Sequence, residues 1–267
     1  MGKTEKNCRV IVTANQKGGV GKTTVCVNLG IGLVRAGKKV CLIDADAQGS
    51  MSASLGVQEP DSLDVTLAEI MEMIVNGEEV EPGLGIMHHA EGVDFMPANI
   101  GLAGVETALV NVMSRETVLR QYIDSLKDEY EYILVDTMPS LGMLTINALA
   151  AADTVLVPLQ TQFLSLKGLE QLIVTILKVK KQINPKLDFE GILMTMVDTR
   201  TNYSKEIMGM VASNYGRRIP VFQNYIPMSV RAAETSAVGK SIYLHDPKGK
   251  AASAFEGLTG EVLAHGK

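Results

Sequence analysis

The sequence predicts one α/β domain, built on a mostly parallel, doubly wound sheet with helices on both faces. Three observations support this fold class. The chain has 267 residues, of which 46% are hydrophobic and 21% charged, as in an ordinary globular domain. Short β-branched runs alternate with longer helical patterns, which is typical of βαβ units. Several short runs are almost continuously apolar, as expected for strands buried on both faces.

The first half of the chain starts with a βαβ unit. We expect a strand at residues 9–14, a helix at residues 23–36 that ends at Gly37, and a strand at residues 39–44. Weaker patterns follow: a helix at residues 63–75, two short strands within 85–96, and helical segments at 102–112 and 116–127.

The second half continues the alternation. Central strands are expected at residues 132–136, 154–158 and 191–197, and a late strand at residues 221–226. Helices are expected at residues 164–183, 202–215, 230–238 and 251–264. No repeat, low-complexity tract or linker interrupts the pattern, so residues 1–267 are expected to form a single domain.

A glycine-rich loop joins the first expected strand to the first expected helix. Residues 15–24 read NQKGGVGKTT. Glycine allows backbone conformations that bring successive N–H groups close to phosphate oxygens, and the following helix presents its positive end to them. In this pattern Lys22 reaches the β- and γ-phosphates of a nucleotide, and the Thr23 hydroxyl binds Mg²⁺. The residues predicted to contact the nucleotide are Gly18, Gly19, Val20, Gly21, Lys22, Thr23 and Thr24.

The loop departs from the strict P-loop pattern. Gln16 stands where the first glycine belongs, and a second lysine, Lys17, lies just inside the loop. This arrangement resembles the deviant P-loop ATPases of the ParA/MinD group, whose loop reads K-G-G-x-G-K-T. In that group the extra lysine crosses a dimer interface and touches the ATP bound by the partner subunit. The resemblance implies that Lys17 and Lys22 are catalytic and that Lys17 couples nucleotide binding to dimerisation.

A pair of aspartates follows the second expected strand. Residues 42–49 read LIDADAQG and look like the D-x-D-x-Q-G element of the same group. The resemblance gives Asp46 the catalytic role of orienting the attacking water and places Asp44 near the metal. Either aspartate could instead cap the next turn, a role that aspartate often takes.

A third aspartate ends an apolar strand, as in a Walker B motif. Residues 132–149 read YILVDTMPSLGMLTINAL and look specifically like the chromosomal and plasmid partition ATPases. Asp136 is therefore expected to lie opposite Thr23 and to hold Mg²⁺ through water. The predicted metal-binding residues are Thr23, Asp44 and Asp136.

The C-terminal third resembles the ParA/Soj branch of this group through residues 191–206 and 226–234. In that branch, basic residues of this region form a DNA-binding surface on the ATP-bound dimer. The candidates here are Arg200, Lys205, Arg217, Arg218, Arg231 and Lys240, although a solvated basic face remains open for any single one. Relatives commonly read I-P-R-N-V-R, whereas Met228 follows Pro227 here, so lower DNA affinity is expected. Pro227 and Met228 also lie where relatives contact the adenine.

The resemblance implies a slow, partner-stimulated ATPase that uses ATP and Mg²⁺. It implies an ATP-dependent homodimer that binds double-stranded DNA non-specifically and drives chromosome or plasmid partitioning with a ParB-like activator. Phosphate contacts of this kind carry no sequence information and depend steeply on salt. The motifs begin close to residue 9, so no N-terminal helix-turn-helix domain is expected. The protein is expected to be cytoplasmic and associated with the nucleoid.

Other functions compete with this one. A non-enzymatic adaptor that only binds nucleotide is disfavoured by the intact Lys22, Asp46 and Asp136. The same ATP switch could position a protein assembly or a conjugative element on the nucleoid, which the sequence does not distinguish from DNA segregation. A MinD-like membrane ATPase needs a basic amphipathic C-terminal helix, whereas residues 251–267 carry Glu256 and Glu261 against Lys267. An iron–sulfur carrier needs paired cysteines, whereas the three cysteines here are scattered. Residues 1–6 lack the apolar stretch of a signal peptide, and no uninterrupted apolar run is long enough to span a bilayer, so a cytoplasmic protein without a membrane partner is expected.

Overall fold

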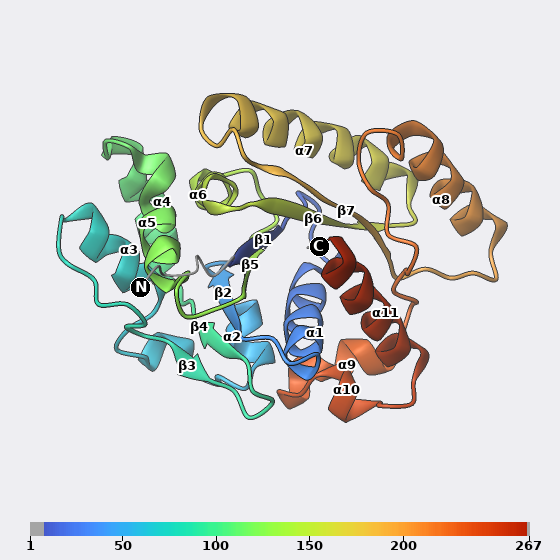
Figure 1. The fold of residues 1–267 in the computed structure, drawn as a ribbon, viewed down its shortest axis with the longest axis horizontal. Helices are drawn as coiled ribbons and strands as arrows, with labels where there is room; N and C mark the ends of the chain where they lie inside the picture. The colour runs from blue at the N-terminus through green and yellow to red at the C-terminus, as the bar shows by residue number, and fades with distance from the viewer. Residues whose placement is uncertain (1–7, 266–267) are drawn as a thin grey trace, which may run out of the picture.

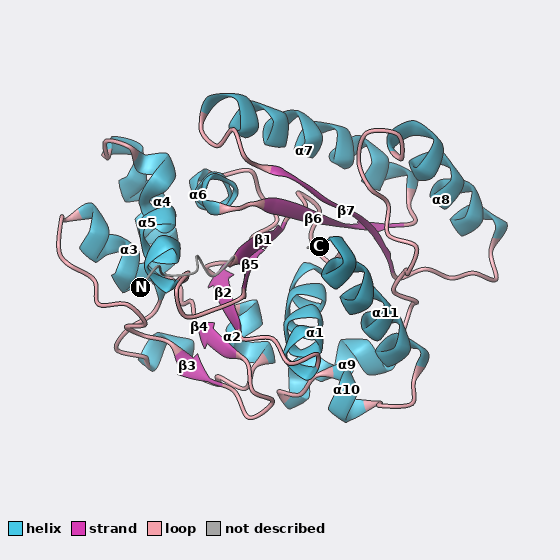
Figure 2. Ribbon diagram, viewed as in Figure 1, coloured by secondary structure: helices cyan, strands magenta, loops and turns pink. Residues whose placement is uncertain are grey.

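A single sheet organises the molecule. The computed structural model describes residues 8–265, apart from the side chain of Leu164, so the segment 1–6 discussed above and Lys267 lie outside the described residues. Seven strands are ordered β3-β4-β2-β5-β1-β6-β7 across the sheet. Figures 1 and 2 show helices packed against both faces of this sheet. The fold class that the sequence predicts is confirmed.

The elements follow one another in strand–helix alternation. The strands are β1 (Arg9–Thr13), β2 (Val40–Ala45), β3 (Met87–His88), β4 (Asp94–Met96), β5 (Tyr132–Thr137), β6 (Thr154–Gln160) and β7 (Asp188–Thr195). The helices are α1 (Lys22–Arg35), α2 (Ser50–Ser54), α3 (Leu67–Val75), α4 (Gly101–Ala108), α5 (Val118–Leu126), α6 (Met143–Ala151), α7 (Phe163–Gln182), α8 (Asn202–Tyr215), α9 (Val230–Val238), α10 (Ile242–His245) and α11 (Lys250–His265). Short 3₁₀ turns lie at Pro60–Ser62, Leu109–Asn111 and Arg115–Thr117.

The strand order creates a reversal point at β1. This strand pairs in parallel with β5 on one side and β6 on the other, and β2 lies beyond β5. The chain therefore leaves β1 toward one edge of the sheet and leaves β5 toward the other edge. Open α/β sheets bind their ligands in the crevice outside the carboxyl ends of the strands at such a reversal.

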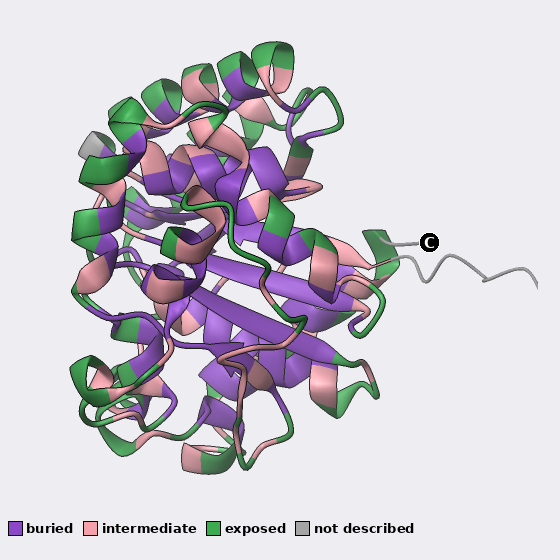
Figure 3. Cartoon of the chain, turned by 90° about the vertical axis from the view of Figure 1, so that its left-hand side faces the viewer, coloured by how far each residue is buried: buried purple, intermediate pink, exposed green. Residues whose placement is uncertain are grey.

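Alternate residues of each central strand enter two separate cores. Val10 and Val12 of β1 pack into the core beneath α3 to α8, whereas Ile11 packs into the core beneath α1, α2 and α9 to α11. Every residue of β2 and of β5 is buried, and Figure 3 shows the strands buried between the two helical layers. This explains why the strands read as nearly continuous apolar runs in the sequence.

The late strand expected at residues 221–226 is wrong. In place of a continuous ladder there are two isolated parallel bridges: Val221 pairs with Ile192 of β7, and Pro227, just after the segment, pairs with Val197, just after β7. Prolines at both of its ends lack the N–H that a ladder needs. In its middle, the backbone N–H groups of Gln223 and Asn224 donate to the carboxylate of Glu261 in α11, both at 2.8 Å. Residues 221–226 are therefore held by hydrogen bonds to α11 as well as by the bridge to β7.

A buried carboxylate joins the first strand to the last helix. The side chain of Glu190 in β7 is fully buried and accepts hydrogen bonds from the Arg9 guanidinium and, at 2.7 Å, from the Thr154 hydroxyl. Nδ1 of His265 in α11 lies 3.3 Å from the same carboxylate. Arg9 also donates to the carbonyl of Val262, at 3.2 Å. We call these contacts the Glu190 cluster.

None of the helices within residues 8–265 combines the length and the apolar composition that crossing a bilayer requires.

Candidate active site

The glycine-rich loop lies at the carboxyl end of β1 and leads directly into α1. Gly19 and Gly21 have φ angles of 70° and 86°, in the left-handed region that side chains disfavour. Two neighbouring strands hold this loop in place. The Thr195 hydroxyl donates to the carbonyl of Val20, and the Gln160 amide donates to the carbonyl of Gly19, both at 2.8 Å. The loop conformation is therefore supported by the ends of β6 and β7.

Lys22, Thr23 and Asp136 meet where this loop enters α1. The Thr23 hydroxyl donates to Oδ2 of Asp136 at 2.6 Å, and Lys22 is buried beside them. Oδ1 of Asp136 is buried and has no hydrogen-bond partner within residues 8–265. A carboxylate oxygen without a partner, next to a threonine hydroxyl, is an oxygen donor set of the kind that Mg²⁺ prefers. These residues therefore fit a magnesium ion.

Burial shifts the protonation of this cluster. It raises the pKa of Asp136 to about 8, with a contribution from the charge of Asp44, while the Thr23 hydroxyl and Lys22 oppose the rise. Burial also lowers the pKa of Lys22, against the attraction of Asp136 and Asp46. Added positive charge favours ionised carboxylates, so a divalent cation at this position would favour the ionised form of Asp136.

Asp44 lies beside Asp136 on the neighbouring strand, in register across β2 and β5. Its Oδ2 accepts hydrogen bonds from the backbone N–H and the hydroxyl of Ser52, both at 2.8 Å, and its Oδ1 accepts from the N–H of Asp46 at 3.2 Å. Burial raises its pKa to about 6, against these bonds. Asp44 thus ties α2 to the turn that carries Asp46.

Asp46 lies just after β2, at the same edge of the sheet as the glycine-rich loop. Its Oδ1 accepts a hydrogen bond from the backbone N–H of Gln48 at 3.0 Å, so the side chain closes a local turn. The side chain is buried, yet close enough to Lys22 to influence that ammonium. Asp46 therefore closes a local turn, as the sequence allowed, and also lies close to Lys22 at the glycine-rich loop.

The ammonium of Lys17 contacts acceptors of its own chain. Nζ lies 3.2 Å from Oε1 of Gln160 and 3.5 Å from Oγ of Ser165, and it also donates to Oε1 of Gln162. The backbone N–H of Lys17 donates to Oδ1 of Asn15 at 3.0 Å. Lys17 therefore points toward the junction of β6 and α7.

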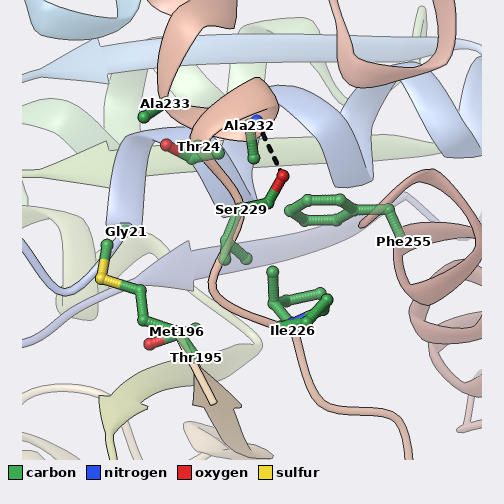
Figure 4. Close-up of a pocket in the computed structure, with 11 residues that line it drawn as sticks. Gly21, Thr24, Thr195, Met196, Ile226, Ser229, Ala232, Ala233 and Phe255 are labelled. Atoms are coloured by element: carbon green, nitrogen blue, oxygen red, sulfur yellow. Dashed lines mark hydrogen bonds between the residues drawn. The ribbon is translucent and has the colours of Figure 1, made fainter. Parts of the chain in front are cut away.

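A small cavity of about 120 Å³ opens beside the start of α1, with room for several water molecules. Figure 4 shows Thr24, Met196, Ile226, Ser229 and Phe255 around it. It is lined by Gly21, Thr24, Val25, Thr195, Met196, Ile226, Pro227, Ser229, Ala232, Ala233 and Phe255. Because it adjoins the glycine-rich loop and is largely apolar, it suits a flat heterocyclic base. Pro227 lines this cavity, whereas Met228 lines a separate groove.

The basic residues predicted to bind DNA are all exposed, but they lie in two groups. The first group, on or beside α8, comprises Arg200, Lys205, Arg217 and Arg218, and the second, on or beside α9, comprises Arg231 and Lys240. Helix α8 packs on one face of the sheet and α9 on the other. Arg200 nevertheless lines one groove with Met228 and with Val230 at the start of α9, whereas Arg217 and Arg218 follow the far end of α8.

Two of these arginines have acidic neighbours. The Arg200 guanidinium forms two hydrogen bonds of 2.8 Å with Asp198, and these bonds lower the pKa of that carboxyl to about 2. Arg231 lies 3.1 Å from Glu234, which also contacts His245. Neutralised arginines attract phosphate less strongly than free ones.

Sequence reasoning missed the residues that support the site. Gln160 and Gln162 follow β6 without forming any motif, and Ser52 lies in a helix of five residues that the sequence does not predict. Met196 has a φ of 52°, which is rare for a side chain of its size. Its sulfur accepts a hydrogen bond from the Gln160 amide at 2.8 Å. Neither residue type nor spacing signals these contacts.

Comparisons with known proteins give consistent results. The model of a family described as AAA domain matches residues 8–189. The chain is 40% identical to the sporulation initiation inhibitor protein Soj of Bacillus subtilis (strain 168) over 260 residues, which span 97% of this chain and 99% of that protein. It is also 40% identical to the chromosome partitioning protein ParA of Myxococcus xanthus (strain DK1622) over 257 residues, covering 96% of this chain and 88% of that protein.

A solved structure is similar over the same extent. The crystal structure described as cobyrinic acid a,c-diamide synthase from Mycobacterium smegmatis, with a bound ATP analogue and magnesium, matches with a TM-score of 0.85 and 36% sequence identity. The match covers 97% of this chain and 96% of that chain. The likeness therefore extends beyond the glycine-rich loop to the whole fold.

Proposed function

Because this chain belongs to the ParA/Soj family of partitioning ATPases, we propose that it is an ATP-dependent homodimer that hydrolyses ATP slowly and segregates DNA. The observation that carries this proposal is the meeting of Lys22, Thr23 and Asp136 at the end of the glycine-rich loop, where one carboxylate oxygen has no partner among the described residues. Nucleotide phosphates would lie on the loop, and the base in the cavity beside α1.

Thr23 and Asp136 would hold Mg²⁺, which neutralises charge on the phosphate oxygens when it is bound. The Lys22 ammonium contributes a second positive charge at the same oxygens. Asp46 positions a water for in-line attack, in which the water oxygen bonds to the γ-phosphorus, the bond from that phosphorus to the β–γ bridging oxygen breaks, and the water gives a proton to a phosphate oxygen. Asp44 and Ser52 would keep the Asp46 turn in place through the contacts described above.

The homodimer gives Lys17 its role. In the proposed dimer, this ammonium contacts the triphosphate bound by the partner subunit and adds positive charge during hydrolysis. Loss of the γ-phosphate removes the contact, so the two copies separate. The lifetime of the dimer is then set by the rate of ATP hydrolysis. This agrees with hydrolysis that is slow until an activator protein of the ParB type accelerates it.

DNA binding would be a property of the dimer. Two copies present two sets of the basic residues on α8 and α9, which lie on opposite faces of one chain. Contacts to phosphates would be non-specific and would weaken steeply with salt. The partners Asp198 and Glu234, and the neutral Met228, favour modest affinity. Such a protein would reside on the nucleoid and would partition a chromosome or plasmid. Positioning of a protein assembly or conjugative element would use the same contacts.

A membrane-binding role is less well supported. Phe255, Leu258 and Val262 form the apolar face of α11, and all three are fully buried in the core. A helix whose apolar face is already packed inside the protein has no such face to offer a lipid surface. The C-terminal helix therefore serves the fold.

The synthase name of the Mycobacterium smegmatis structure does not change the proposal. A reaction through a thiol nucleophile needs an accessible cysteine that ionises readily. Burial raises the pKa of Cys8 to about 12, and it raises the pKa values of the fully buried Cys26 and Cys41 well above their ordinary value. These thiols do not suit such a step.

Size-exclusion chromatography with ATP, with ADP and without nucleotide tests the proposal, and the series is then repeated with DNA. We expect dimers with ATP only, and no nucleotide binding by Lys22→Ala. Asp46→Ala should bind ATP, remain dimeric and hydrolyse at least about a hundredfold more slowly. A chain that stays monomeric with every nucleotide, even as Asp46→Ala, contradicts the proposal.

A further inference from the structure

The Lys17 ammonium is fully engaged within its own subunit. A lysine ammonium has three N–H donors, and three side-chain oxygens surround this one, from Gln160, Gln162 and Ser165. All three acceptors are uncharged. We call these three residues the lysine dock.

Gln160 and Ser165 of the lysine dock are held in place by other contacts within the subunit. Gln160 cannot turn away easily, because its amide nitrogen donates to the carbonyl of Gly19 and to the sulfur of Met196, both at 2.8 Å. Gln162 occupies the N-cap position of α7. Ser165 is buried in the first turn of that helix, and its N–H donates to the carbonyl of Gln162 at 3.0 Å.

One ammonium cannot occupy the lysine dock and contact a nucleotide in another subunit at the same time. The backbone N–H of Lys17 donates to Asn15, and the side chain can leave the lysine dock without breaking this bond. We propose that the lysine dock holds Lys17 in the monomer and thereby sets how readily ATP-bound subunits dimerise. This inference rests on the proposed function, because it assumes that Lys17 acts across the dimer interface.

The effect on dimerisation is amplified by symmetry. Apparent affinity falls in proportion to the fraction of molecules in the competent state. Each dimer needs two undocked lysines, so the undocked fraction enters the dimer dissociation constant as its square. If one acceptor changes that fraction about threefold, which is modest for a bond to a charged group, the dissociation constant changes about tenfold.

Gln162 allows a test in both directions, since its side chain is exposed and contributes a single acceptor oxygen to the lysine dock. Gln162→Ala removes an acceptor and should lower the dimer dissociation constant about tenfold. Gln162→Glu offers Lys17 a charged acceptor of the same length and should raise that constant about tenfold. The constant is measured by sedimentation equilibrium with a slowly hydrolysed ATP analogue.

Gln171 supplies matched controls on the same helix. Its side chain is exposed, and Gln171→Ala and Gln171→Glu repeat the changes in size and charge away from Lys17. Both controls should stay within about twofold of the unmodified chain. Opposite shifts for the two Gln162 variants support the inference. Shifts of the same sign, or shifts no larger than those of the controls, overturn it.

A second readout does not require a dimer. In the nucleotide-free monomer, the acylation rate of Lys17 by an amine-reactive ester, followed by mass spectrometry, should rise about threefold in Gln162→Ala and fall in Gln162→Glu. Equal acylation rates of Lys17 in all variants would overturn the inference that the lysine dock holds its ammonium. If these rates respond but no nucleotide produces a dimer, the proposed function fails and so does control of dimerisation by the lysine dock. If dimers form normally and neither readout responds, only the lysine dock fails.

Discussion

Asp44 and Asp136 are two carboxyls that lie side by side in the interior of the protein. Both are buried at the carboxyl ends of adjacent strands, where water cannot stabilise their charges. Proteins rarely bury carboxylates without a compensating cation. Here the nearest compensation is Lys22, whose own pKa is lowered by burial. The site is therefore electrostatically incomplete without its ligands, which is consistent with a nucleotide and metal site.

This arrangement predicts how stability depends on pH without nucleotide. Burial raises the pKa of Asp136 to about 8 and that of Asp44 to about 6, so the folded protein keeps protons that the unfolded chain loses near pH 4. Their contribution to the free energy of unfolding is therefore greatest at acidic pH and declines as pH rises toward 8. The decline is at most about 1.4 kcal/mol per pH unit for each proton.

Thermal unfolding at pH 6, 7, 8 and 9 measures this dependence. Asp136→Asn cannot ionise, so its stability relative to the unmodified chain should rise between pH 6 and 8 and level off above the folded pKa of about 8. Asp64→Asn, at an exposed position, should follow the unmodified chain throughout. Parallel curves for Asp136→Asn and the unmodified chain would contradict the raised pKa.

At the scale of single elements, helix α2 depends on one serine. Its five residues are too few to show a helical period, which is why the sequence does not predict it. Ser52 connects this helix to Asp44 through two hydrogen bonds and accepts one from the N–H of Ala98 at 3.0 Å. Tertiary contacts therefore fix the helix, and contacts of this kind leave no local pattern in a sequence.

Ser52→Ala should lower the free energy of unfolding by about 1–3 kcal/mol, because it leaves buried polar groups without partners. Urea titration measures the loss. Ser54→Ala in the same helix is the control, since that hydroxyl only donates to the carbonyl of Ser50 near the surface, and it should change stability by less than about 0.5 kcal/mol. Equal effects of the two substitutions would refute the special role of Ser52.

The longer elements were predictable because their signals, unlike those of α2, lie in local sequence patterns. The glycine-rich loop, α1 and the central strands carry their signals within short stretches, through glycine positions, apolar runs and helix ends. The segment 221–226 misled the same reasoning. Its apolar residues suggest a strand, but whether it pairs continuously depends on Glu261 in a distant helix.

At the scale of the whole molecule, the sequence predicts the fold class and the proximity of Thr23 and Asp136 at the glycine-rich loop, but not the grouping of the basic residues. Their positions on α8 and α9 depend on which face of the sheet each helix covers, and no local pattern encodes that choice. The Glu190 cluster is equally invisible, because Arg9 and Glu190 are 181 residues apart in the chain.

Arg9→Ala should destabilise the protein by about 3 kcal/mol, because it leaves a fully buried carboxylate without its charged partner. Lys39→Ala removes an exposed pair with Glu129 and should cost less than about 1 kcal/mol. Both losses are read from urea unfolding. Nucleotide affinity should be unchanged in Arg9→Ala, because β1 begins at this residue and the glycine-rich loop follows its other end. A loss similar to that of Lys39→Ala would contradict the prediction.

The Glu190 cluster also affects how the protein unfolds. Arg9 opens β1, Thr154 opens β6, and His265 ends α11, and all three meet at one side chain. The starts of β1 and β6 and the last turn of α11 are therefore tied to one side chain of β7, and Arg9 also bonds α11 directly through the carbonyl of Val262. Amide hydrogens in β1 and α11 should therefore exchange with solvent together, as one cooperative unit with the slow rate of global unfolding.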